Sequence, residues 1–163
     1  MTAMPSSRRA EVTLPADDQI LITRRFDAPR HLVYRAWTTP ELVRRWWCGR
    51  RGAMTHVEMD LRVGGAWRYV MTASGGHEVG FHGEYREIVP DERLVWTEVY
   101  EGAPEGEPAL VTATFAEADG ATTLSLLTEV ESKAVRDMIA ESGMEIGVQE
   151  QMEILDEILP TLR

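Results

Sequence analysis

Glu98 is the strongest candidate for a chemical role. It alternates with Leu94, Trp96 and Tyr100 on one face of an expected strand. A carboxyl group among aromatic rings loses hydration, so its pKa rises and it can donate a proton or a hydrogen bond near neutral pH. If this face points inward, Glu98 is a candidate general acid or a polar contact for a ligand. An exposed glutamate, or one paired with an arginine, is the commoner outcome for this residue type.

Aromatic side chains recur at a spacing of two on the segments that precede Glu98. Trp67, Tyr69 and Met71 share one face of the first segment. Phe81 and Tyr85 share a face of the next, with a glycine between them that leaves room beside the rings. Such stripes more often fill a core than line a ligand pocket. The two tyrosine hydroxyls either orient a polar group of a ligand or lie at a wet rim.

The other reactive side chains do not form a recognisable catalytic or metal-binding pattern. The four histidines have no partners at the spacing of a metal site, so we expect no metal ion. Cys48 stands among arginines whose charge lowers a thiol pKa, but no cysteine and histidine arrangement accompanies it. The Arg44 to Arg51 cluster is either a solvated face or a contact for an anionic ligand. Without a phosphate-binding glycine loop or a serine nucleophile motif, we expect no cofactor.

Length and composition favour one acidic globular domain. The chain has 163 residues, of which 44% are hydrophobic, enough to bury roughly 70% of the unfolded surface. A net charge of −10 repels phosphate, so neither nucleic acid nor an anionic membrane surface is an expected partner. A single cysteine fits a reducing compartment, and no segment is apolar enough for membrane insertion or secretion. We therefore expect a soluble, cytoplasmic protein.

The elements that must position these side chains follow from apolar periodicity. Residues 1–18 lack it and are expected to form a mobile N-terminal segment, followed by a single domain at residues 19–163. Asp27 is the predicted N-cap of a first short helix and Thr39 that of a second. Seven strands are predicted, at residues 19–26, 55–61, 66–73, 77–88, 94–101, 110–116 and 121–131. Short connections between the last six indicate an antiparallel meander.

The C-terminal region is predicted to form two helices. The predicted ranges are 132–141 and 144–159. Their apolar residues fall on opposite faces at 100° per residue, so one straight helix cannot bury both, and Gly143 is expected to end the first. The second carries an apolar seam, including Val148 and Met152, that requires a broad apolar surface. Gly147 in its interior indicates close approach of a strand or a ligand.

Several separated motifs occur in an order that is typical of one family. They lie at residues 26–29, 33–37, 40–47, 62–65, 90–97 and 143–147. Together they resemble the SRPBCC superfamily, and within it the branch named after the activator of Hsp90 ATPase homologue 1. The resemblance implies an α+β helix-grip fold: a curved antiparallel sheet of six to seven strands around a long C-terminal helix, with an apolar cavity between them. The chain departs from the family at Val148, where tryptophan is frequent, and at residues 48–51, which replace a Gly-Pro pair.

The resemblance makes the aromatic faces a candidate ligand-binding cavity. Its predicted lining is Trp67, Tyr69, Met71, Phe81, Tyr85, Trp96, Glu98, Phe115, Val148 and Met152. We expect it to bind a small hydrophobic, aromatic or amphipathic molecule. Two alternatives stay open: an enzyme similar to polyketide aromatase/cyclases, with Glu98 as the catalytic candidate, and an interaction module similar to Hsp90 co-chaperones. An exposed edge strand could also pair two copies as a homodimer.

Overall fold

Eight strands form one antiparallel sheet in the order β1-β2-β8-β7-β6-β5-β4-β3 in a computed structural model that describes residues 9–102 and 106–162. The strands are β1 (Glu11–Thr13), β2 (Gln19–Phe26), β3 (Gly52–Met59), β4 (Ala66–Ala73), β5 (Glu78–Val89), β6 (Arg93–Tyr100), β7 (Ala109–Ala118) and β8 (Ala121–Glu129). The helices are α1 (Arg30–Thr38), α2 (Pro40–Trp46), α3 (Lys133–Ala140) and α4 (Met144–Ile158), followed by a 3-10 turn at Leu159–Leu162.

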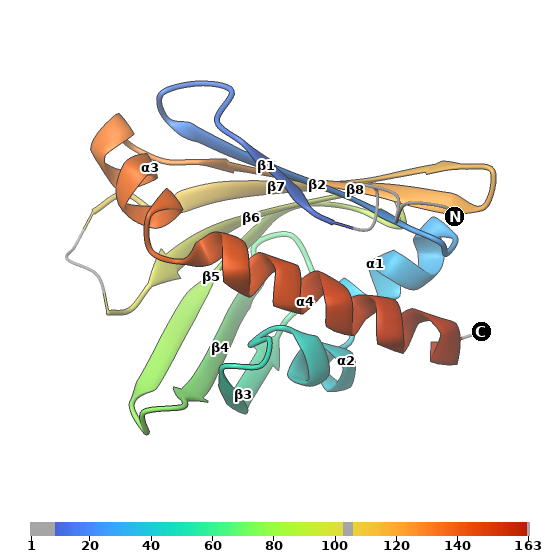
Figure 1. Ribbon diagram of the computed structural model, residues 1–163, viewed down its shortest axis with the longest axis horizontal. Helices are drawn as coiled ribbons and strands as arrows, with labels where there is room; N and C mark the ends of the chain where they lie inside the picture. Colours follow the sequence, from blue (N-terminus) through green and yellow to red (C-terminus); the bar gives the residue numbers. More distant parts are fainter. Residues whose placement is uncertain (1–8, 103–105, 163) are drawn as a thin grey trace, which may run out of the picture.

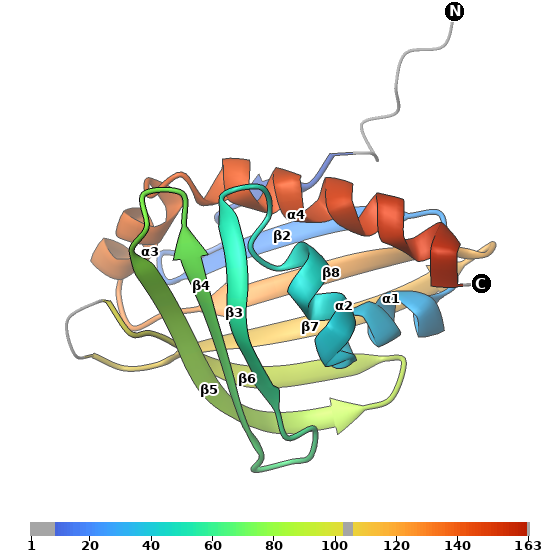
Figure 2. The ribbon, with the colours of Figure 1, turned by 90° about the horizontal axis from the view of Figure 1, so that it is seen from below.

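The sheet curves around α4, which lies across its concave side (Figures 1 and 2). Helices α1 and α2 interrupt the run of strands and lie beside the C-terminal half of α4 (Figure 2), where α2 packs against both β3 and α4. The predicted α+β class, curved antiparallel sheet and long C-terminal helix are therefore confirmed. No helix within the described ranges is both long and apolar enough to cross a bilayer.

The strand count differs from the prediction because β1 forms within the segment expected to lack regular structure. Its three residues pair with β2 through Glu11↔Thr23, Val12↔Ile22 and Thr13↔Leu21. So short a strand gives too little alternation to be detected in the sequence, and it forms because β2 offers a free edge. The first part of the predicted N-terminal segment, residues 1–8, lies outside the described residues.

The C-terminal helices divide where the apolar pattern predicted. Ser132 caps α3 by accepting a hydrogen bond from the Val135 amide at 3.2 Å. Gly143 then adopts a left-handed φ of +87°, and α4 begins at the next residue. The expected close approach of a strand to Gly147 is wrong, because the nearest atom to a Cβ built there is the Arg51 guanidinium carbon at 4.0 Å. No strand approaches this glycine closely.

The hydrophobic core explains why α4 packs against the concave side of the sheet. Met152, Leu155 and Ile158 on its inner seam are at most 2% exposed, and they belong to the same buried cluster as Phe115 and Leu124 of the sheet. Burying side chains of this size contributes roughly 1.5 to 3 kcal/mol each relative to leaving them exposed. The seam therefore fixes which face of α4 meets the sheet.

One predicted helix start is wrong. Helix α1 begins at Arg30 after Pro29, whose extended conformation (φ −66°, ψ 151°) places it at the N-cap in place of Asp27. The Asp27 carboxylate instead accepts a hydrogen bond from Arg25 at 2.8 Å. Thr39 is the N-cap of α2 as predicted, although its side chain makes no capping hydrogen bond among the contacts of the described residues.

Candidate functional site

All five tryptophans of the chain line one pocket. Trp37 of α1, Trp46 of α2 and Trp47 directly after α2 come from the helical side, while Trp67 of β4 and Trp96 of β6 come from the sheet. The lining is completed by Tyr69, Tyr85, Leu94 and Glu98. The pocket has a volume of about 30 Å³ and is partly open to solvent. A volume of this size admits about two water molecules without any movement of the walls.

The pocket lies between the two short helices and strands β4 to β6. It joins five of the ten residues predicted to line a cavity: Trp67, Tyr69, Tyr85, Trp96 and Glu98. The other five lie elsewhere. Val148 and Met152 are 9% and 1% exposed in the core beneath α4, and Phe115 packs edge-on against Tyr34 at 5.6 Å. Met71 is buried on β4, and half-buried Phe81 contacts Trp47 with ring centroids 5.0 Å apart.

Sequence reasoning did not assign four lining residues to the site, namely Trp37, Trp46, Trp47 and Leu94. Their apolar periodicity was visible in the short helices and in β6, but periodicity reports burial and not which cavity a side chain meets. The signal that would have found three of them is composition. Tryptophan is rare, and three of the five cluster within residues 37–47.

Glu98 places a carboxyl group in this aromatic pocket. Glu98 is half-buried, and part of its surface lines the pocket. Burial raises the pKa of the Glu98 carboxyl, while a hydrogen bond from Trp96 Nε1 to Oε1 at 3.3 Å acts in the opposite direction. The sequence left open whether this face points inward, and the structure places Glu98 in the pocket lining.

The two tyrosine side chains of the pocket lie close enough to influence each other's pKa. Burial raises the pKa of Tyr69 well above its ordinary value, and the nearby Glu98 charge adds to that rise. Burial also raises the pKa of Tyr85 to about 12, even though the Tyr69 hydroxyl acts in the opposite direction. Both hydroxyls therefore stay protonated at neutral pH and are available as neutral polar contacts.

Gly83 fixes the position of Trp67 in the pocket wall. Trp67 Nε1 donates to the Thr97 carbonyl oxygen at 3.1 Å across the position of Gly83 on β5. A Cβ at residue 83 would overlap that carbonyl oxygen and lie 2.7 Å from Trp67 Nε1. The glycine permits the close packing of β4, β5 and β6 here, so it does not leave empty space beside the rings.

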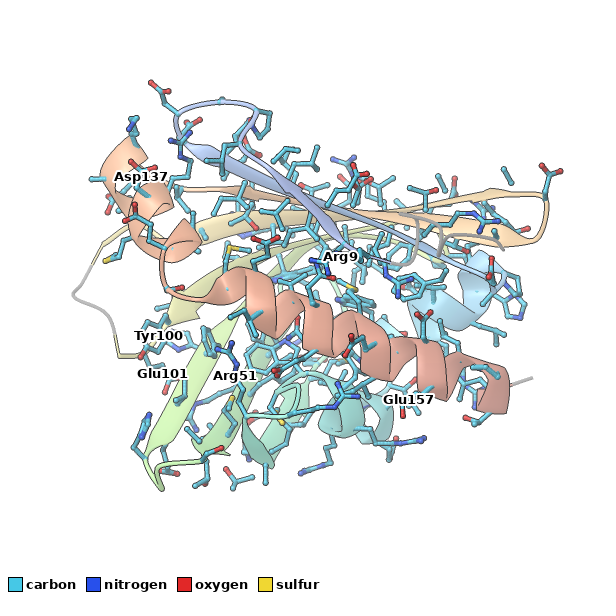
Figure 3. The ribbon with its side chains drawn as sticks, in the orientation of Figure 1. Arg9, Arg51, Tyr100, Glu101, Asp137 and Glu157 are labelled. Atoms are coloured by element: carbon cyan, nitrogen blue, oxygen red, sulfur yellow. The ribbon has the colours of Figure 1, made fainter. Side chains whose placement is uncertain are left out.

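The loop after α2, residues 47–51, is held onto α4 by polar contacts. Gln151 of α4 donates to the Trp47 carbonyl oxygen, and Arg50 forms ion pairs at 3.2 Å with both Glu153 and Glu157. Figure 3 shows Glu157 on the side of α4 that faces α2. These contacts fix the backbone that carries Trp47, and through it one wall of the pocket.

The remaining sequence candidates lie outside the pocket lining. Arg51 approaches Glu150 of α4 at 3.7 Å, so the arginine cluster is partly neutralised by acidic residues, whereas Arg44 and Arg45 are exposed. Burial raises the pKa of the Cys48 thiol, which reduces its thiolate fraction and its reactivity. Among the described side chains, no group of three or more histidine, cysteine or acidic residues is arranged to hold a metal ion.

A curved antiparallel sheet closed by a C-terminal helix, with a pocket beneath two early helices, defines the class of this protein. Residues 27–160 match the family described as Activator of Hsp90 ATPase homolog 1-like protein. The chain belongs to that family, as its motifs predicted.

Solved structures share the fold over nearly the whole chain. A protein from Rhodobacter sphaeroides is 26% identical with a TM-score of 0.87, over 94% of this chain and 99% of the other. One from Chromobacterium violaceum is 28% identical with a TM-score of 0.78, over 88% and 98%. One from Nitrosomonas europaea, at 23% identity and a TM-score of 0.82 over 91% and 98%, supports the fold alone. No curated protein matches the chain.

Proposed function

We propose that the protein binds a small amphipathic molecule in the pocket between α1, α2 and strands β4 to β6. The observation that carries this proposal is the placement of one carboxyl group and two hydroxyl groups in a partly open pocket lined by every tryptophan of the chain. Ligand pockets combine apolar and aromatic walls with a few polar groups that fix orientation. Membership of the family adds support, since the resemblance noted in the sequence implies ligand binding inside the fold.

The size of the pocket limits how the ligand enters. Ligand sites for drug-sized molecules enclose about 300 to 1,000 Å³, whereas this one has about 30 Å³. The proposal therefore places only a small polar head inside the pocket. The apolar remainder lies against Trp47 and Trp96, which keep part of their surfaces exposed.

The first test uses the tryptophans as reporters. Native mass spectrometry of the purified protein identifies any co-purifying molecule, and fluorescence titration then measures its affinity, because all five indoles surround the pocket. Tyr85→Phe removes one hydroxyl and is expected to weaken binding about five-fold, the equivalent of one hydrogen bond. Tyr100→Phe is the control, since Tyr100 is exposed and lies outside the pocket. A co-purifying ligand whose affinity is unchanged by Tyr85→Phe contradicts the proposed site.

Further measurements test the two other functions considered from the sequence. Turnover of the bound molecule that is lost in Glu98→Gln would indicate an enzyme, and stimulation of Hsp90 ATPase activity would indicate the role in the family's name. No contact among the described residues supports either of these two functions. A cytoplasmic location and a homodimer through an edge strand, here β1 or β3, stay predictions.

A further inference from the structure

We propose that the head group received by this pocket is a small organic cation, such as a protonated amine, with Glu98 as its counter-ion and the tryptophan rings as its walls. This inference rests on the proposed function of the pocket and specifies the chemical class of its ligand. It is carried by three features of the pocket: the kind of ring that lines it, the isolation of its carboxyl group, and its volume.

The rings are of the kind that attracts cations. Tryptophan presents the most favourable aromatic face for a cation, and tyrosine also contributes. Five tryptophans and two tyrosines make up seven of the nine lining residues. The indole N–H groups of two of these rings already donate to the protein backbone. Trp46 Nε1 donates to the Ala36 carbonyl oxygen at 3.0 Å, and Trp67 Nε1 donates to the Thr97 carbonyl oxygen at 3.1 Å. The polar edges of these rings are thus occupied by the protein.

The carboxyl group of the pocket has no cationic partner in the described structure. It accepts a hydrogen bond from the neutral Trp96 N–H at 3.3 Å, and none of the nine lining residues is lysine, arginine or histidine. Other carboxylates of this chain are paired: Glu101 with Arg68 at 2.9 Å, and Glu153 with Arg50 at 3.2 Å. A ligand ammonium would supply the missing charge, and the ring faces would replace part of its hydration.

The volume and the overall charge agree with a compact cation. About 30 Å³ accommodates roughly two water-sized groups, which is the size of an aminomethyl terminus. A longer alkyl tail would then leave the pocket over the exposed parts of Trp47 and Trp96. The net charge of −10 raises the local concentration of cations and disfavours anionic ligands.

The protonation states of the pocket predict how the binding of a cation depends on pH. The titratable groups that line the pocket are Glu98 of β6, Tyr69 of β4 and Tyr85 of β5, and Tyr34 of α1 is close enough to raise the pKa of Tyr85. Because burial raises the pKa of Glu98 and both lining tyrosines titrate far above neutrality, Glu98 is the group that changes charge on ammonium binding. Binding of an amine therefore strengthens as pH rises through the pKa of Glu98 and releases a proton below it.

The experiment compares three probes of equal chain length: hexylamine, hexanol and hexanoate. Isothermal titration calorimetry and tryptophan fluorescence are run at pH 5 to 8, in buffers of different ionisation enthalpy so that proton release is measured directly. We expect hexylamine to bind at least ten-fold more tightly than hexanol at pH 7.5, and hexanoate to bind most weakly. Glu98→Gln should abolish the advantage of the amine, whereas Glu84→Gln on the exposed side of β5 should preserve it.

The outcomes distinguish failure of the cation assignment alone from failure of the ligand site. If hexanol or hexanoate binds as tightly as hexylamine, the cation assignment is overturned and the pocket remains a ligand site. If none of the three binds, both the cation assignment and the ligand site are contradicted. Proton release by the unmodified protein tests the role of Glu98 even if Glu98→Gln does not fold.

Discussion

Glu101 shows the opposite electrostatic situation to Glu98, only three residues further along the chain. It lies at the end of β6, where Arg68 donates two hydrogen bonds of 2.9 Å and His82 Nδ1 lies 2.8 Å from its Oε2 (Figure 3 labels Glu101). These two partners lower the pKa of the Glu101 carboxyl to about 2, with the hydrogen bonds from Arg68 the largest cause. The pKa values of two glutamates three residues apart are therefore shifted in opposite directions, because Glu101 is solvated and paired whereas Glu98 is partly buried without a cationic partner among the described residues.

Acid titration is predicted to expose this ion cluster. Because the folded pKa of Glu101 lies below its unfolded value, its stabilising contribution is present above about pH 4.5 and is lost as the pH falls towards about 2. The cluster is exposed, so solvent screening limits the contribution to about 1 kcal/mol or less. Urea unfolding between pH 2 and 6 should show a flatter pH dependence for Glu101→Gln than for the parent, with Glu92→Gln as the exposed control. Identical profiles for parent and Glu101→Gln would contradict this assignment.

Helix α4 depends on two glycines that lie four residues apart and play different roles. Gly143 has a φ of +87°, where a Cβ is strained, whereas Gly147 lies inside the helix with its nearest neighbour 4.0 Å away. Gly147→Ala should therefore raise the free energy of unfolding by about 1 kcal/mol, because alanine favours a helix interior. Gly143→Ala should lower it by about 1 to 2 kcal/mol. Urea denaturation of the pair measures both, and a loss of stability in Gly147→Ala would mean that this face of α4 is packed more tightly than described.

At the scale of the whole molecule, an ion pair with a buried arginine joins α4 to β2 of the sheet. Arg24 of β2 is 3% exposed, contacts Asp156 of α4 through its guanidinium and stacks 4.7 Å from the Phe26 ring. The pair spans the first strand of the core and the last helix, so it ties together the two ends of the folded chain. Such pairs contribute little net stability when intact, but removing one partner leaves the other charge buried and uncompensated.

Breaking this pair is predicted to destabilise the entire fold. Asp156→Asn should lower the free energy of unfolding by about 3 kcal/mol, since the Arg24 charge would remain buried without a counter-charge. Glu153→Gln, at an exposed position of the same helix, should change it by about 0.5 kcal/mol or less. Thermal or urea unfolding monitored by circular dichroism provides the measurement. Equal effects of the two substitutions would show that Arg24 finds water or another acceptor.

The sequence by itself determined the order and kind of the elements, because both follow from local periodicity and turn chemistry. The strands at residues 19–26 and 66–73 were predicted with the bounds found in β2 and β4, and the break at Gly143 was predicted from a change of apolar phase. Alternation along β6 placed Glu98 on the same face as Trp96, but it did not decide whether that face points inward. The strand β1 and the start of α1 were missed, since each depends on a few residues whose conformation the neighbouring chain decides.

Only the tertiary structure decided where the pocket lies and how large it is. Alternation showed that the aromatic faces of the strands are buried, but it carries no information about what covers them. The two short helices bring Trp37, Trp46 and Trp47 over Trp67 and Trp96, and they leave about 30 Å³ between. The space left inside a fold is the difference between the volume its elements enclose and the volume its side chains fill, and a cavity therefore depends on every packed element at once.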